Sequence, residues 1–190
     1  MARPRSEDKR NAILVAATQV IAEQGESAPT ARIAKVAGVA EGTLFTYFSN
    51  KDELLNQLYL QLKEEVREAM MLAYPRAESV KNRSRHVWQS YVDWGVREPQ
   101  KRKALAQLGM SERVTPHSKS VGMQAFAEIS TMMQESIAKG LLRDHPPAFV
   151  SAIMSSLAET TMDFMARDPA EAARYRTSGF NAFWNAIAHP

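Results

Sequence analysis

The sequence predicts an all-α protein of about nine helices, with a small three-helix head followed by a larger helical body. Apolar residues recur at the three- and four-residue spacing of helices along the whole chain. Glycines and prolines divide the chain into intervals of helical length. No interval shows the sustained alternation of apolar and polar residues that is typical of a strand. We therefore expect residues 7–67 to form the head and residues 75–190 to form the body.

Composition narrows the class of protein. The 190 residues include no cysteine, which excludes disulfides, thiol catalysis and cysteine-based zinc sites. Hydrophobic residues make up 45% of the chain, but no apolar run approaches the roughly 18 residues that a membrane-spanning helix needs. The charged N-terminal segment does not resemble a signal peptide, so we expect a soluble, cytoplasmic protein without a membrane partner. A formal net charge of +3 permits a polyanionic partner without establishing one.

The head is predicted from helix signals that follow one another along the chain. A first helix presents one apolar face and is expected to end at Gly25; the face consists of Ile13, Leu14, Ala17, Val20 and Ile21. Two short apolar patterns then flank the pair Gly38-Val39, which predicts two short helices around a tight turn. A long helix is expected to start near residue 51, capped by Asn50 or Ser49, and to continue to about Tyr74-Pro75. Its apolar stripe consists of Leu54, Leu55, Leu58, Leu62 and Val66.

Residues 30–51, TARIAKVAGVAEGTLFTYFSNK, have the form of a helix-turn-helix, which we place at about residues 30–49. In such a unit the turn sets two helices at a steep angle, and the second helix lies in the major groove of DNA. The inner face must be apolar, and its members are Ile33, Ala34, Ala37, Val39, Leu44 and Phe48. The outer face carries groups suited to bases and phosphates: Thr30, Arg32, Glu41, Gly42, Thr43, Thr46, Tyr47 and Lys51, with Lys35 on the same side. The predicted partner is therefore double-stranded DNA.

Different chemistry is expected of these residues. Arg32 can read a base edge with its guanidinium, and Gly42 lets the backbone approach DNA without an intervening side chain. Glu41 can accept a hydrogen bond from a cytosine or weaken binding by facing phosphates, and both roles stay open. The basic residues near the N-terminus can follow the DNA backbone or enter a minor groove as an arm; they are Arg3, Arg5, Lys9 and Arg10. For Arg3 and Arg5 a tail that does not contact DNA is an equal alternative.

From about Arg10 to Leu58 the chain resembles the DNA-binding domain of the TetR family. The resemblance rests on fixed spacings in one continuous run, which are Ile13-Leu14, Ala16-Ala17, Gly25, Ile33-Ala34, Ala37-Gly38-Val39, Gly42-Thr43-Leu44, Tyr47-Phe48, Lys51 and Leu54. It implies that Thr43 and Tyr47 face operator DNA and that Lys51 meets a phosphate. Ala40 departs from the family's usual serine, which removes a helix cap that is usually worth roughly 1 kcal/mol. Phe45 stands where tyrosine is common.

Five further helices are expected beyond Pro75, between the breakers Pro99, Gly109, Pro116, Gly140, Pro146-Pro147 and Pro169. The resemblance implies that the last two helices build a dimer interface and that the preceding ones enclose a small-molecule effector. The expected interface residues are Ile153, Leu157, Phe164, Phe180, Phe183, Trp184 and Ile187. The residues expected to line an apolar pocket are Trp88, Tyr91, Trp94, Met110, Met123, Phe126, Met133 and Met154, although each suits an ordinary core as well.

The sequence contains no motif that indicates an enzyme. We find no glycine-rich phosphate loop, nucleophile elbow or HExxH pattern, and the histidines lack the spacing of a metal site, so we expect no catalysis, metal or cofactor. We expect a homodimeric transcriptional repressor that leaves a pseudo-palindromic operator when an apolar or amphipathic effector binds. The alternative is a helical homodimer that acts through a protein partner and binds DNA weakly.

Overall fold

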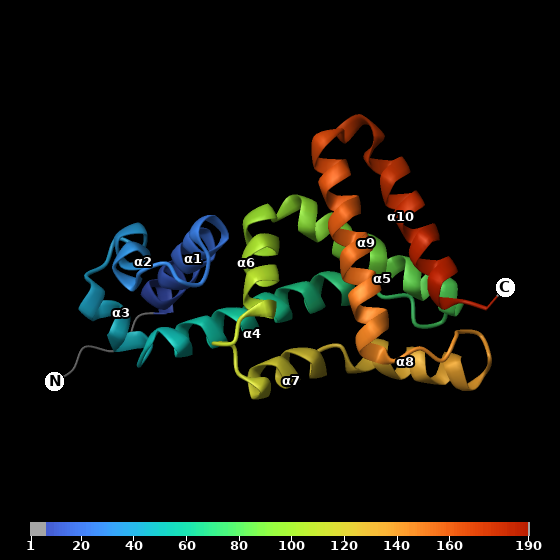
Figure 1. The fold of residues 1–190 in the computed structure, drawn as a ribbon, viewed down its shortest axis with the longest axis horizontal. Coiled ribbons are helices and arrows are strands. Elements are labelled where there is room, and N and C mark those ends of the chain that lie inside the picture. The colour runs from blue at the N-terminus through green and yellow to red at the C-terminus, as the bar shows by residue number, and fades with distance from the viewer. Residues whose placement is uncertain (1–6, 190) are drawn as a thin grey trace. The chain divides into compact units, whose positions relative to one another are not determined.

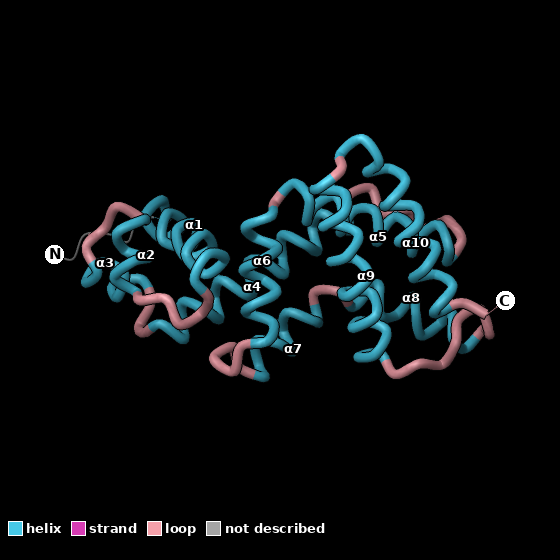
Figure 2. Tube along the Cα trace, turned by 45° about the horizontal axis from the view of Figure 1, so that its top comes forward, coloured by secondary structure: helices cyan, strands magenta, loops and turns pink. Residues whose placement is uncertain are grey.

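The computed structural model describes residues 7–189, which form ten α-helices and one 3₁₀ turn (Figure 1). Within this range loops join one helix to the next and no residue lies in a β-strand (Figure 2). The predicted all-α fold is confirmed. Contacts divide the chain into two compact units, a first unit of residues 7–65 and 98–125 and a second unit of residues 66–97 and 126–189. Among the described residues, no helix combines the length and apolar character needed to span a membrane.

The first unit contains the three N-terminal helices, the start of a long helix and two helices from the middle of the chain. These are α1 (Glu7–Gln24), α2 (Thr30–Val36), α3 (Glu41–Tyr47), the start of α4 (Lys51–Met71), α6 (Pro99–Met110) and α7 (Pro116–Gln124). Its core buries Ile13, Ile33, Leu44 and Leu54 completely. Each such side chain stabilises the fold by about 1.5–3 kcal/mol, so this core holds α2 and α3 against α1 and α4.

Local sequence explains where these helices begin and end. Gly25 has a φ of 84°, and its N–H donates to Ile21 O over 2.8 Å, so α1 ends at this glycine as predicted. Asn50 caps α4, because its Oδ1 accepts from the Glu53 N–H over 2.8 Å. The Glu53 carboxylate in turn accepts from the Ser49 N–H over 2.6 Å. Both candidate capping residues therefore take part in starting α4.

The second unit is a helical cluster around aromatic side chains. It contains the end of α4, α5 (Val80–Arg97), α8 (Ala127–Ala138), α9 (Pro147–Arg167), the 3₁₀ turn η1 (Pro169–Glu171) and α10 (Ala172–Ile187). Helices α9 and α10 run in opposite directions on either side of η1, and α5 packs against both (Figure 1). Trp88 of α5 is completely buried and stacks on Phe183 of α10, with ring centroids 5.7 Å apart. Its indole N–H donates to Arg176 O over 3.0 Å, which satisfies the polar atom of this core aromatic.

The structure contains one α-helix more than the nine or so that the sequence predicts. The sequence presents residues 116–140 as one interval, but α7 ends at Gln124 and α8 starts at Ala127. Ala125 and Phe126, which separate them, carry no local helix-breaking signal. The break coincides with the border between the two units. The chain leaves the core of the first unit and enters the core of the second unit at this point.

The division by contacts also differs from the predicted domain boundary. The sequence pattern assigns all of residues 75–190 to the body, whereas residues 98–125 pack within the first unit. Leu108 and Val114 fill the same core as α1 to α4, with exposures of 0% and 1%. Long-range packing decides this assignment, and no local pattern reveals it. The roles assigned to the body remain predictions.

Candidate nucleic-acid interface

Helices α2 and α3 form the expected helix-turn-helix. Gly38 has a φ of 68°, a conformation that costs little only for glycine, and it reverses the chain between the two helices. The Gly38 N–H donates to Lys35 O over 3.2 Å, and the Val39 N–H donates to Ala34 O over 3.0 Å. These bonds close the C-terminal end of α2 and fix the path of the chain into α3.

The apolar inner face of the helix-turn-helix packs into the core of the first unit, as predicted. Ile33 and Leu44 are completely buried, and Ala34 and Phe48 are exposed by only 2% and 1%. They belong to one core cluster with residues of α1 and α4, against which Val39 also packs. Packing against the rest of the first unit therefore contributes to the angle between α2 and α3.

None of the eight residues predicted to contact DNA is buried. Arg32, Glu41, Gly42 and Thr46 are exposed, and the half-buried members are Thr30, Thr43, Tyr47 and Lys51. A Cβ added at Gly42 would meet nothing within 4 Å, so α3 presents open backbone at this position. The Thr46 hydroxyl donates to Gly42 O over 3.2 Å. Its oxygen therefore remains able to accept a hydrogen bond from a ligand.

The N-termini of α2 and α3 lack side-chain caps. Pro29 and Ala40 occupy the two capping positions, and neither makes a capping hydrogen bond. The Thr30 hydroxyl instead donates to Glu41 Oε1 over 2.6 Å, which joins the first residue of α2 to the first residue of α3. Sequence reasoning did not find this bond, because nothing in the local pattern pairs residues 11 positions apart.

Lys51 is the first residue of α4 and is half-buried. Burial lowers the pKa of the Lys51 ammonium, and the neighbouring positive charge of Arg113 lowers it further, while Glu26 and Asp52 oppose the shift. A phosphate near Lys51 would favour its charged form, since opposite charges stabilise one another. The contact of Lys51 with a phosphate remains a prediction.

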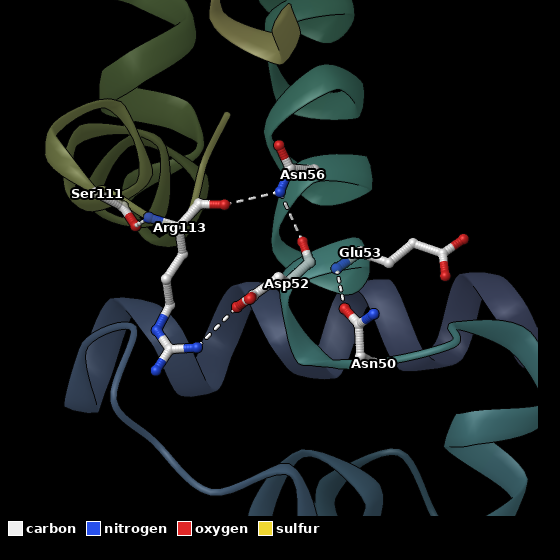
Figure 3. A network of polar contacts seen from close by, with 6 residues as sticks. All are labelled: Asn50, Asp52, Glu53, Asn56, Ser111 and Arg113. Carbon is white, nitrogen blue, oxygen red and sulfur yellow. Dashed lines mark hydrogen bonds and ion pairs between the residues drawn. The ribbon is translucent and has the colours of Figure 1, made fainter. Parts of the chain in front are cut away.

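A polar network ties the first turns of α4 to the loop between α6 and α7 (Figure 3). The Arg113 guanidinium donates to Asp52 Oδ1 over 2.7 Å. Asn56 Nδ2 donates to Arg113 O over 2.8 Å, and Asn56 Oδ1 accepts from the Thr115 N–H over 2.9 Å. One amide side chain thus binds the loop backbone on both sides of Val114, whose side chain is buried in the core.

Comparison with known proteins identifies the family. The sequence profile described as "Bacterial regulatory proteins, tetR family" matches residues 13–58. The crystal structure of a tetR family transcription regulator from Shewanella sp. PV-4 is 28% identical to this chain. It superposes with a TM-score of 0.86 over 98% of this chain and 100% of that one. Residues 13–58 therefore match the TetR family, and nearly the whole chain shares the fold of one of its regulators.

Two curated relatives match over shorter stretches. The HTH-type transcriptional regulator YhgD of Bacillus subtilis is 37% identical over 78 residues, which are 38% of this chain and 41% of the relative. The fatty acid metabolism regulator protein of the same species is 48% identical over 48 residues, 25% of each chain. The chain thus matches less than half the length of these two relatives. A Bacillus subtilis regulator solved in complex with stearoyl-CoA shares the fold at 18% identity, with a TM-score of 0.70 over 92% of this chain and 97% of that one.

The structure also places two residues of the head that the sequence singles out, Phe45 and Arg10. Phe45 exposes 43% of its surface on α3, the helix expected in the groove. Arg10, expected in a DNA-binding arm before the first helix, lies in α1 and packs on the first unit. It donates to Gln57 Oε1 over 2.8 Å and lies 5.7 Å from the centre of the Phe48 ring. Lys9 is exposed on α1. The other two predicted arm residues, Arg3 and Arg5, lie outside the described residues.

The residues predicted to line an effector pocket fall in both units. Met110 and Met123 lie in the first unit and are 80% and 46% exposed. Met110 borders an open depression of about 380 Å³ between Gly25 and Ser111. In the second unit Trp88 and Trp94 are buried, and the half-buried members are Tyr91, Phe126, Met133 and Met154. Four of the predicted pocket residues pack in one core cluster of the second unit; they are Trp88, Tyr91, Met133 and Met154. Their burial is explained by this core, and their contact with an effector remains a prediction.

The residues predicted at the dimer interface also divide into two groups. Phe180, Phe183 and Ile187 fill the core of a single chain, with exposures of 2%, 4% and 1%. Their burial follows from the packing of α10 on α5 and α9. Phe164 is 46% exposed, and the half-buried members are Ile153, Leu157 and Trp184. In the part of the chain that the structure describes, no group of three histidine or acidic side chains could hold a metal ion.

Proposed function

We propose that this TetR-family protein is a homodimeric, sequence-specific transcriptional repressor. The observation that supports this most is the outer face of α2 and α3, where Arg32, Glu41, Gly42 and Thr46 are exposed above a buried apolar inner face. A rigid helix with small and hydrogen-bonding residues on its open side suits the major groove. In a dimer, two such helices would meet half-sites about 34 Å apart, which predicts a pseudo-palindromic operator.

The proposed contacts divide into two kinds. Arg32 is exposed on α2 and offers a planar guanidinium, so we assign it to direct reading of a guanine. Lys51, at the start of α4, offers a single ammonium group, so we propose that it contacts a DNA phosphate. Thr43, Thr46 and Tyr47 would supply further contacts from α3. Base contacts select a sequence, whereas phosphate contacts strengthen binding to all DNA.

We propose that the dimer forms through α9. Phe149 and Phe164 expose 54% and 46% of their surfaces, and the half-buried residues Ile153 and Leu157 lie between them in the sequence. These four positions are separated by four, four and seven residues, a spacing that places them on one side of a helix. A self-complementary apolar face of this kind fits a second copy of the chain related by two-fold symmetry.

We propose that the effector is amphipathic and has a long apolar chain. One relative is named a fatty acid metabolism regulator, and another regulator of the same fold was solved with stearoyl-CoA. Methionines adapt to irregular apolar ligands, and Met133 and Met154 of the second unit are candidates for this contact. The effector can release DNA only if it binds the two conformations of the protein with different affinities.

The test begins with a library of random-sequence duplexes incubated with the purified chain. The enriched duplex is then compared with a scrambled duplex of the same composition by fluorescence anisotropy. We expect a pseudo-palindrome that binds at least about 1,000-fold more tightly than the scrambled duplex. Stearoyl-CoA should weaken this binding, and coenzyme A alone should not. Failure to enrich any sequence contradicts the proposed function, whereas enrichment without a response to stearoyl-CoA contradicts only the effector class.

A further inference from the structure

The first residues of the two helix-turn-helix helices are joined side chain to side chain. The Thr30 hydroxyl donates to Glu41 Oε1 over 2.6 Å, so a neutral donor meets an ionised acceptor at the short distance typical of a charge-assisted bond. Thr30 begins α2, and Glu41 begins α3. The bonded residues are close in sequence to Arg32 and Gly42, which belong to the face of the helix-turn-helix that is proposed to contact DNA.

This bond gives α3 a second attachment to α2. The turn at Gly38 joins the C-terminal end of α2 to the start of α3 through the backbone. The Thr30–Glu41 bond joins the N-terminal end of α2 to Glu41, the first residue of α3. The core already holds α3 through Leu44. The Thr30–Glu41 bond adds a restraint on rotation of α3 about the turn, because such a rotation would break the bond.

The two helices need such a restraint more than longer ones would. Each has seven residues, about 10 Å of helix. Short helices are marginal by themselves, and their stability comes from packing and from caps. Pro29 and Ala40 supply no side-chain cap to either helix. The contact between Thr30 and Glu41 is a polar link at the ends that lack caps.

We propose that Glu41 is a positioning residue, which holds α2 and α3 at their binding angle through Thr30 and does not itself read a base. The proposal rests on the proposed DNA-binding function. Two other roles for Glu41 make different predictions. A base reader would act without Thr30, and an acid that merely repels phosphates would weaken binding to all DNA alike. Only a positioning role makes the effects of Thr30 and Glu41 depend on one another.

The test is a double-mutant cycle of Thr30→Val and Glu41→Ala in the full chain. The quantity measured is the preference for the enriched duplex over the scrambled duplex, in which any uniform change in phosphate repulsion cancels. Each single variant should lose about three- to tenfold of this preference, the range expected of one partly exposed charge-assisted bond. The double variant should lose no more than the worse single variant. Thr30→Ser, which keeps the hydroxyl, should restore most of the preference.

A second measurement needs no DNA. Amide hydrogen exchange in α3 should be faster in Thr30→Val and in Glu41→Ala than in the wild type. Glu23→Ala is the matched control, because it removes an exposed acid of α1 that accepts from Gln19 over 3.0 Å within its own helix. This control should leave exchange in α3 unchanged.

The proposal is overturned by any of three results. Additive losses in the cycle would assign Glu41 a role independent of Thr30. A full loss in Glu41→Ala with none in Thr30→Val would make Glu41 a base reader. Unchanged exchange in α3 of both variants would show that the bond restrains nothing. If the wild type enriches no duplex, the proposed DNA-binding function fails, while the exchange experiment still decides whether Thr30 and Glu41 hold the two helices together.

Discussion

Asn56 donates from its side-chain amide to the backbone oxygen of Arg113 over 2.8 Å, across 57 positions of sequence. The same amide accepts from the backbone of Thr115, so it holds the α6–α7 loop at α4 from both sides of Val114. Arg113 adds an ion pair with Asp52 at 2.7 Å, but these two side chains are 48% and 56% exposed. A neutral amide and a charged pair thus hold the same loop, and their contributions to stability should differ.

We expect Asn56→Ala to destabilise the protein more than Arg113→Ala. Asn56→Ala leaves the Thr115 N–H and the Arg113 carbonyl without their partner, which should lower the free energy of unfolding by about 1–3 kcal/mol. Arg113→Ala keeps the backbone contacts and loses an exposed ion pair, so it should cost less than about 1 kcal/mol. Urea unfolding followed by circular dichroism measures both. The reverse order would show that the ion pair holds the loop.

Gly179 should tolerate no side chain. A Cβ at Gly179 would lie 2.7 Å from Trp88 Cζ2 and would also collide with Thr161, so Gly179→Ala should destabilise by about 1–3 kcal/mol through overpacking. Gly109→Ala is the matched control, since a Cβ there meets nothing within 4 Å. Because Gly109 lies in α6, alanine should stabilise that helix by roughly 0.5–1 kcal/mol. Thermal melting of both variants tests the pair, and equal effects would refute this packing argument.

Phe164→Glu should split the dimer while leaving the chain folded. Phe164 is 46% exposed, so a charge there meets solvent in the monomer and an apolar partner in the proposed dimer. Phe183→Glu would be a poor test, because Phe183 stacks on Trp88 within one chain and its loss should unfold the second unit. Leu72→Glu is the control, an exposed apolar residue outside α9 and α10. Sedimentation should show a monomer for Phe164→Glu and a dimer for Leu72→Glu; a dimer in both would remove α9 from the interface.

The affinity for DNA should depend on the protonation of Lys51. The pKa of Lys51 in the free protein lies below the ordinary 10.5, mainly through burial, so its neutral form appears at lower pH than for an exposed lysine. A phosphate contact requires the charged form, and binding must then be accompanied by proton uptake. Affinity should therefore fall as pH rises from about 8 towards the ordinary lysine range. Lys51→Arg, which stays charged, should remove this dependence. Parallel pH profiles for the wild type and Lys51→Arg would show that Lys51 meets no phosphate.

Local signals were enough to predict much of the first unit. Gly25 and Gly38 have the positive φ angles that their positions suggest, and Asn50 caps α4. The apolar inner face of the helix-turn-helix is buried, because the spacing of its residues follows directly from helix geometry. The break between α7 and α8 could not be predicted in the same way, since Ala125 and Phe126 carry no local helix-breaking signal and the break coincides with the border between the two units.

Sequence patterns were least informative where a residue's partner lies far along the chain. The apolar face with Phe180 and Phe183 could equally meet a second chain or the chain's own core, and only the packing of α10 on α5 and α9 places it in the core. Trp88 is ambiguous in the same way between pocket and core. The Thr30–Glu41 and Asn56–Arg113 bonds join residues 11 and 57 positions apart. Short-range spacing contains no information about such pairs.

The central claim is that α2 and the start of α4 contact DNA in two different ways, and one measurement tests it most directly. Binding of wild type, Arg32→Ala and Lys51→Ala to the enriched and scrambled duplexes is measured across a series of salt concentrations. Arg32→Ala should cost about 1–3 kcal/mol on the enriched duplex and much less on the scrambled one. Lys51→Ala should weaken binding to both duplexes equally and flatten the salt slope by about 1.8, because two phosphate contacts are lost per dimer. Equal losses on both duplexes for Arg32→Ala, together with an unchanged salt slope for Lys51→Ala, would contradict this assignment of the DNA-binding surface.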